Sequence, residues 1–217
     1  MAAVIFDLDG TLVDSVPDIH LAVNQMLEAE GQAALDIATV TSFVGNGLPK
    51  LTERVIRHQG MDMAQHGRIT ADLLAIYQSA PVKLAKPYPG MQAALKALQE
   101  AGHVMGVCSN KPYGPAVHLL CELGLDGYFR AVVGGDSLPT RKPEPEMLIE
   151  TQAQLGAAHV LYVGDSEIDA ETAVNAGIGF ALFTEGYRKC PVEDIPHDYV
   201  FEDYRHLPDI VSRHFAG

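Results

Sequence analysis

Four short clusters of polar residues interrupt a largely apolar pattern, and their carboxylates are the first candidates for chemistry. Alternation along a strand would place Asp7 and Asp9 on one side, where two carboxylates repel unless a cation or a shared proton lies between them. Asp165 adds a third negative charge, and carboxylate oxygens suit Mg²⁺ rather than zinc or a soft metal. The sequence therefore predicts a Mg²⁺ site. The clusters are Asp7-Leu8-Asp9-Gly10-Thr11, Ser109-Asn110-Lys111, Lys142-Pro143, and Gly164-Asp165 followed by Asp169.

The remaining polar residues have the chemistry needed to hold a phosphoryl group. Two like unit charges about 4 Å apart repel by roughly 4 kcal/mol at an effective dielectric constant near 20, and a phosphate dianion roughly doubles that repulsion. A divalent ion and Lys142 would offset this repulsion between an attacking carboxylate and a phosphate. The Ser109 hydroxyl and the Asn110 amide could then hold the non-bridging oxygens in line for attack. The set is typical of phosphoryl transfer.

Short apolar runs alternate with helical patterns along much of the chain, which predicts a doubly wound, Rossmann-like parallel α/β sheet. Two of the helical patterns end at Gly102 and Gly156, as helix C-termini often do. The polar clusters follow the apolar runs, so they should meet beyond the carboxyl ends of the strands, where such folds bind ligands. The predicted strands cover residues 3–6, 104–108, 131–133, 160–163 and 178–183.

The stretch between Asp9 and Val104 is far longer than one crossover helix requires. It has helical but no strand-like periodicity, so we expect an all-helical domain over residues 15–80, inserted in a core formed by residues 1–14 and 81–217. Helices are expected from Ser15, a candidate N-cap residue, and over residues 48–59 and 67–79.

Composition excludes several classes of function. The chain has 28 acidic and 15 basic residues and a formal net charge of −13, which argues against a surface that binds nucleic acid. The first residues reach Asp7 with no basic leader or long apolar stretch, so a cytoplasmic protein without a membrane segment is expected. Three cysteines without CxxC spacing predict no disulfide framework or zinc knuckle.

In their order along the chain, the four clusters resemble the four motifs of the haloacid dehalogenase superfamily. That resemblance implies that Asp7 is a nucleophile that forms an aspartyl-phosphate, and that Asp9 protonates the leaving alkoxide and then activates water. It also implies that Mg²⁺ is held by the Asp7 and Asp165 carboxylates and by the backbone carbonyl of Asp9. Asp169 would act on metal-bound waters or on Lys142. The helical insertion corresponds to what this superfamily calls a C1 cap.

Shorter segments resemble the phosphoglycolate phosphatases of that superfamily, which implies hydrolysis of 2-phosphoglycolate to glycolate and phosphate. Ser109 stands where many relatives have threonine, and both offer a hydroxyl. Backbone amides around Gly45, Asn46 and Gly47 could bind the substrate carboxylate, and Lys50 and Arg54 are further candidates. The segments are Val44-Gly45-Asn46-Gly47, Pro87-Tyr88-Pro89-Gly90, Ser109-Asn110-Lys111-Pro112, Val133-Gly134-Gly135-Asp136 and Gly186-Tyr187.

Two other classes of function stay open at this point. One is another enzyme of the same fold, such as a sugar-phosphate phosphatase, a pyrophosphatase or a phosphomutase, because Asp9 does not separate these from one another. The other is a non-enzymatic phospho-acceptor, which a nucleophile on the first strand and a cap over residues 15–80 both oppose. A dehalogenase is disfavoured, because it lacks the second aspartate. The sequence does not distinguish a monomer from a homodimer.

Overall fold

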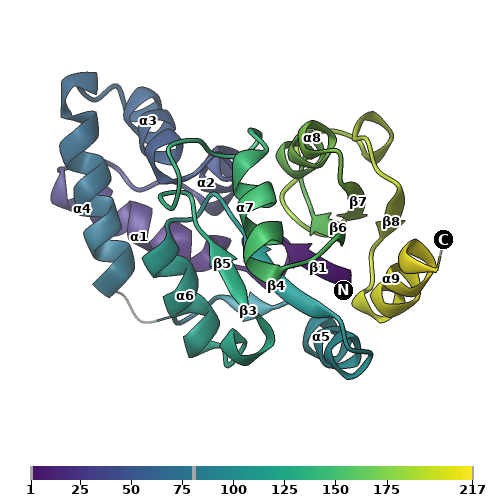
Figure 1. Cartoon of the computed structure of the whole chain (residues 1–217). Helices are drawn as coiled ribbons and strands as arrows, with labels where there is room; N and C mark the ends of the chain where they lie inside the picture. The colour runs from purple at the N-terminus through teal and green to yellow at the C-terminus, as the bar shows by residue number, and fades with distance from the viewer. Residues whose placement is uncertain (1, 80–81, 217) are drawn as a thin grey trace.

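The computed structural model describes residues 2–79 and 82–216, and its centre is a six-stranded parallel sheet (Figure 1). In sheet order the strands are β5 (Ala131–Val133), β4 (Val104–Cys108), β1 (Ala2–Phe6), β6 (His159–Gly164), β7 (Gly179–Phe183) and β8 (Tyr199–Phe201), each parallel to its neighbours. Strands β1 and β4 are almost continuous buried apolar runs, which is typical of a parallel sheet covered on both faces. The predicted fold class is confirmed.

The edge strand β8 was not predicted from the sequence. It has only three residues, and the side chain of its central residue, Val200, is exposed. A short, half-exposed edge strand produces no apolar run, so the sequence pattern alone does not reveal it.

Helices cover both faces of the sheet and form two separate apolar cores. Val4 and Phe6 of β1 belong to one core, and Ala3 and Ile5 belong to the other, because alternate side chains of a strand point to opposite faces. The first core includes residues of α5 (Met91–Glu100), α6 (Tyr113–Glu122) and α9 (Leu207–Phe215), and the second includes residues of α7 (Glu146–Leu155) and α8 (Glu167–Ala176).

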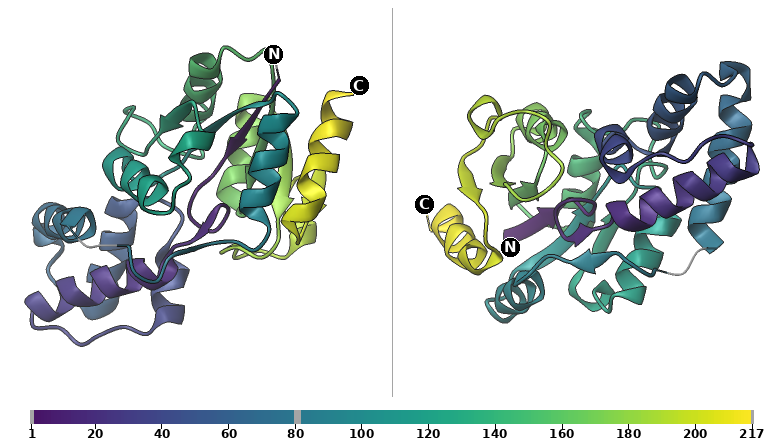
Figure 2. Two further views of the ribbon diagram at one scale, coloured as in Figure 1. Left: turned by 90° about the horizontal axis from the view of Figure 1, so that it is seen from below. Right: turned by 180° about the vertical axis from the view of Figure 1, so that it is seen from behind.

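Four further helices gather beside the sheet, around an apolar core of their own (Figures 1 and 2). Their buried residues include Val23, Leu27, Val55 and Ile69. The helices expected near residues 48–59 and 67–79 correspond to α3, which spans Leu48–Gln59, and α4, which spans His66–Ser79. The four are α1 (Val16–Ala29), α2 (Ile37–Phe43), α3 (Leu48–Gln59) and α4 (His66–Ser79), and short 3₁₀ turns lie at Met63–Gln65, Asp126–Tyr128, Val192–Asp194 and Tyr204–His206.

Two neighbouring segments connect these helices to the sheet. Strands β2 (Val13–Asp14) and β3 (Lys86–Pro87) pair antiparallel, one leading into α1 and the other returning from α4. The Asp18 carboxylate of α1 accepts hydrogen bonds from the backbone N–H groups of residues 83, 84 and 85, which ties the returning chain to the start of the insertion. The predicted boundary at residues 80 and 81 lies outside the described residues.

Two observations bear on membranes and on cysteine chemistry. Within residues 2–79 and 82–216, the helices are too short or too polar to cross a bilayer. Cys108 is buried in β4, whereas Cys121 and Cys190 are exposed, and all three thiols are free.

The two faces of α7 allow a matched test of the core. Leu148 is fully buried, whereas the neighbouring Ile149 is 48% exposed. We expect Leu148→Ala to lower the free energy of unfolding by about 2–5 kcal/mol, because it leaves a cavity beneath the sheet. Ile149→Ala should change it by less than about 0.5 kcal/mol. Urea unfolding of both variants measures the difference, and equal losses would contradict the assignment of α7's buried face.

Candidate active site

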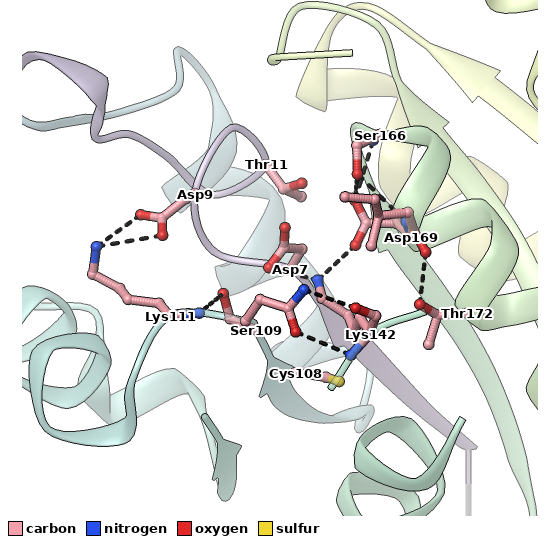
Figure 3. Close-up of polar contacts among 12 residues, drawn as sticks. Asp7, Asp9, Thr11, Cys108, Ser109, Lys111, Lys142, Ser166, Asp169 and Thr172 are labelled. Carbon is pink, nitrogen blue, oxygen red and sulfur yellow. Dashed lines mark hydrogen bonds and ion pairs between the residues drawn. The ribbon is translucent and has the colours of Figure 1, made fainter. Parts of the chain in front are cut away.

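The polar residues predicted from the sequence meet at the carboxyl ends of the parallel strands (Figure 3). Asp7 follows β1, Ser109 and Asn110 follow β4, and Asp165 follows β6. Lys142 reaches the same place from the segment before α7, and its side chain is only 2% exposed. A parallel sheet brings these ends to one edge, so residues far apart in the sequence share one site.

Three buried carboxylates form the most acidic part of this site. Asp7, Asp165 and Asp169 each place one oxygen within 4.8 Å of the others. Burial and the nearby charges of Asp169 and Asp9 raise the pKa of Asp7 to about 6, although Lys142 opposes the shift. Burial, with the charges of Asp169 and Asp7, raises the pKa of Asp165 well above its ordinary value. The cluster has more negative charge than its surroundings neutralise.

Lys142 supplies the positive charge inside this cluster. Its Nζ lies 2.6 Å from Asp169 Oδ1 and 3.0 Å from Asp7 Oδ1, and it donates a hydrogen bond of 3.0 Å to the Tyr162 hydroxyl. Burial would lower the pKa of Lys142, but the Asp169 and Asp7 carboxylates outweigh burial and raise it above its ordinary value. The lysine therefore stays charged between the two carboxylates.

Asp169 is held on the opposite side by its own helix. Its Oδ2 accepts hydrogen bonds from the backbone N–H and the hydroxyl of Ser166, the N-cap residue of α8. Burial alone would raise the pKa of Asp169, but Lys142, Ser166 and Tyr162 lower it. This capping box fixes the carboxylate that pairs with Lys142.

The backbone closes tightly around Asp165. Its Oδ1 accepts a 2.7 Å hydrogen bond from the Thr11 hydroxyl, and its Oδ2 accepts one of 2.7 Å from the backbone N–H of Tyr187. Gly10 has φ +88°, and a Cβ there would lie 2.5 Å from Asp165 Oδ2. A Cβ on Gly186 would also collide with this carboxylate. Glycine at both positions therefore allows the two loops to enclose Asp165.

The Asp9 side chain lies outside the three-carboxylate cluster. Its carboxylate accepts a hydrogen bond from the Ser15 hydroxyl, and Lys111 Nζ lies 3.1 Å from Oδ1 and 3.3 Å from Oδ2. The cation beside the Asp9 carboxylate is therefore a lysine that the sequence analysis left without a role. Ser15 is the N-cap residue of α1, as predicted, but its side chain makes no hydrogen bond to that helix and donates to Asp9 instead.

Asn110 connects three parts of the site. Its Nδ2 donates hydrogen bonds of 3.0 Å to the Lys142 carbonyl and 3.1 Å to the Gly45 carbonyl, and its Oδ1 accepts one of 3.0 Å from the Lys142 N–H. Both amide hydrogens are thus directed at backbone carbonyls rather than at a phosphate position. The Ser109 hydroxyl remains at the site and accepts a 3.3 Å hydrogen bond from the Lys111 N–H.

The candidate carboxylate-binding residues of the insertion lie in different places. Gly45 and Gly47 line a cavity of about 60 Å³ beside Asp7 and Ser109. Asn46 accepts a 2.7 Å hydrogen bond from Arg54, whose guanidinium also donates to the Phe43 carbonyl. Lys50 is half exposed and pairs with Glu53 on its own helix. Of these candidates, only the two glycines line the cavity.

The lysine network generates a prediction about stability. Tyr162→Phe should lower the free energy of unfolding by about 1–3 kcal/mol, because the buried Lys142 and Asp169 each lose a hydrogen-bond partner. Tyr199→Phe is the matched control, since that tyrosine is only partly buried on the edge strand β8, and it should cost less than about 0.5 kcal/mol. Urea unfolding measures both, and a neutral Tyr162→Phe would contradict the network.

Comparison with known proteins agrees with this geometry. A family model described as haloacid dehalogenase-like hydrolase matches residues 4–183. A phosphoglycolate phosphatase of Cereibacter sphaeroides is 47% identical over 218 residues, covering 100% of both chains. A phosphoglycolate phosphatase of Rhodobacter capsulatus is 48% identical, over 97% of this chain and 96% of its own.

A solved structure shows the same fold. The crystal structure of a predicted phosphoglycolate phosphatase from Haemophilus somnus superposes with a TM-score of 0.89 at 28% identity, covering 96% of each chain. The family model and the full-length relatives confirm the resemblance inferred from the four polar clusters. The chain belongs to the haloacid dehalogenase-like hydrolase family.

Proposed function

We propose that this protein is a Mg²⁺-dependent phosphatase that hydrolyses 2-phosphoglycolate to glycolate and phosphate. The observation that carries the proposal is the buried Asp7 carboxylate beside the 60 Å³ cavity, with Lys142 at 3.0 Å and Ser109 on the same wall. Full-length relatives that are named phosphoglycolate phosphatase support the choice of substrate. We infer that the protein acts on this small phosphorylated metabolite in the cytoplasm.

The acidic cluster fits Mg²⁺. Three buried carboxylates face a single lysine, and Asp7 Oδ1 accepts no hydrogen bond from the described residues, because its contact with Lys142 is an ion pair outside hydrogen-bond geometry. Oxygen ligands of this kind are those that Mg²⁺ prefers. We assign the ion to the Asp7 and Asp165 carboxylates and the Asp9 carbonyl, with Asp169 holding Lys142. When bound, it would neutralise the repulsion between Asp7 and the phosphate.

The chain's own residues perform the proposed reaction in two steps. An Asp7 carboxylate oxygen bonds to phosphorus while the bond from phosphorus to the glycolate oxygen breaks, and the Asp9 carboxyl gives its proton to that oxygen. Asp9 then takes a proton from water, and the resulting hydroxide bonds to phosphorus, which releases phosphate and restores Asp7. Lys142 and the Ser109 hydroxyl hold the phosphoryl oxygens in place through both steps.

We propose further that residues 15–80 act as a cap over a core formed by residues 1–14 and 81–217. Two contacts support this role: the Gly45 carbonyl accepts a hydrogen bond from Asn110, and Lys189 Nζ donates one of 3.0 Å to the Val44 carbonyl. These bonds hold the cap loop against the core and enclose the cavity beside Asp7. A closed cap excludes bulk water while the carboxylate attacks, and its opening releases product.

Steady-state kinetics test the activity. With Mg²⁺, kcat/KM for 2-phosphoglycolate should exceed that for hexose phosphates, pyrophosphate and 3-phosphoglycerate by tenfold or more, equal to about 1.4 kcal/mol in transition-state binding. Asp7→Asn should abolish turnover without unfolding the protein, because the amide cannot act as the nucleophile. Preference for another phosphate would point to a different phosphatase or a mutase. A stable acyl-phosphate without turnover would indicate a phospho-acceptor.

Thermal unfolding tests the metal site without relying on activity. Mg²⁺ at a hundred times its Kd should raise the wild-type free energy of unfolding by about 2.7 kcal/mol. Asp165→Asn should lose this response, yet be at least as stable as wild type without metal, because one of three like charges is gone. Asp194→Asn, at an exposed carboxylate, should keep the response. If Asp165→Asn kept the full Mg²⁺ response, Asp165 would not be a ligand of the ion.

A further inference from the structure

Lys111 occupies a position that the reaction described above does not use. Its Nζ lies 3.1 Å from Asp9 Oδ1 (Figure 3). It also donates a 2.7 Å hydrogen bond to the hydroxyl of Tyr77, on the cap helix α4. The ammonium group also lies 4.3 Å from the centre of the Tyr77 ring. The Lys111 side chain is only 4% exposed and lines the cavity beside Asp7, so this charge lies between core and cap rather than in bulk solvent.

Apolar side chains and charged side chains line different sides of the cavity beside Asp7. Apart from Tyr77, the side chains that line it from the cap are apolar, and they include Ile19, Leu48, Leu51 and Leu74. Lys111 is the only cationic side chain that lines it among the described residues. A substrate with several hydroxyls would bury them against the apolar lining without partners, whereas one anionic group beside Lys111 would be paired.

The other nearby cations do not line this cavity. Lys142 lies between Asp7 and Asp169, and Arg54 donates to the Phe43 carbonyl and to Asn46. Lys189 donates to the Val44 carbonyl and lines an adjoining hollow, which shares Asp7, Asp9, Val44 and Gly45 with the cavity but extends toward Asp165 and Glu167. Lys111 is thus the cation available to a second anionic group of the substrate inside the cavity.

The position of Lys111 also matches the length of such a substrate. It lies against Asp9, the residue assigned to protonate the ester oxygen, and its N–H donates to Ser109 at the phosphoryl site. In 2-phosphoglycolate a single carbon separates the ester oxygen from the carboxylate. A cation beside Asp9 is therefore placed to meet that carboxylate while the phosphoryl group remains on Asp7.

We propose that Lys111 is the specificity residue that binds the substrate carboxylate, with Tyr77 of the cap holding the ammonium group in place. This assignment rests on the proposed function and deepens it, since it defines the substrate class as small phosphate monoesters with a carboxylate next to the ester carbon. In the absence of substrate, Asp9 and the Tyr77 hydroxyl are the partners of the ammonium group.

The test compares two phosphate monoesters of similar size, 2-phosphoglycolate and ethyl phosphate, which lacks the carboxylate. Because Asp9 loses its cation in this variant, Lys111→Met should lower activity on both esters, but kcat/KM for 2-phosphoglycolate should fall a hundredfold or more further than kcat/KM for ethyl phosphate, with the difference mainly in KM. The variant should also weaken inhibition by free glycolate. Lys96→Met removes an exposed lysine of α5 and should leave both substrates unaffected.

A second variant keeps the assay informative where Lys111→Met fails to fold. Tyr77→Phe retains the lysine but removes the hydroxyl that orients it, and should raise KM for 2-phosphoglycolate by about threefold to tenfold without affecting KM for ethyl phosphate. Equal losses of kcat/KM for both esters in these variants would overturn the assignment. The role of Lys111 would then be limited to its contact with Asp9. If the wild type itself does not favour 2-phosphoglycolate over ethyl phosphate, the proposed function fails. If the wild type favours 2-phosphoglycolate but the variants lose both activities equally, only the role of Lys111 fails.

Discussion

The structure is organised around one electrostatic constraint, the crowding of Asp7, Asp165 and Asp169 at the ends of two neighbouring buried strands. Carboxylates in a desolvated place repel one another, and a fold tolerates them only where fixed cations and hydrogen-bond donors surround them. Lys142 meets this need between Asp7 and Asp169, while Thr11 and a backbone N–H meet it at Asp165. The same crowding that costs stability creates a site with a deficit of positive charge, and such a deficit is what a divalent cation and a phosphoryl-transfer site need.

Two lysines divide the positive charge of the site, and each is oriented by a tyrosine. The ammonium group of Lys142 contacts Tyr162 of β6 and Asp169 of α8, so it is held by the sheet and a helix that packs on it. Lys111 pairs with Tyr77, which belongs to the cap helix α4, so its position depends on how the cap sits on the core. In the proposed reaction the first pair acts on the phosphoryl group, which every phosphate ester shares. The second pair joins α4 to the segment after β4, so in our proposal substrate selection and cap closure depend on the same contact.

The sequence predicts the scaffold of the site better than its contacts. The strands over residues 104–108 and 160–163 are recognisable because burial on both faces demands continuous apolar runs, and polar residues directly after such runs must share an edge. The partners of Asp9 could not be foreseen in this way. Ser15 reads as an ordinary N-cap residue, and Lys111 lies 102 positions away in the chain. Such contacts depend on the paths of loops and on the seating of the cap, which local periodicity does not encode.

Tyr187 shows how closely the acidic cluster and the cap are tied. Its backbone N–H donates to Asp165, its hydroxyl donates a 2.6 Å hydrogen bond to Asp14 in β2, and the same hydroxyl accepts one of 3.1 Å from the N–H of Val16 at the start of α1. One residue of the core therefore contacts both a buried carboxylate of the site and the segment that leads into the cap. Any rotation of the cap about β2 and β3 must either break the bonds of the Tyr187 hydroxyl or carry its loop along. Because that loop also encloses Asp165, the geometry of the acidic cluster and the position of the cap are coupled as long as the bonds of the Tyr187 hydroxyl persist.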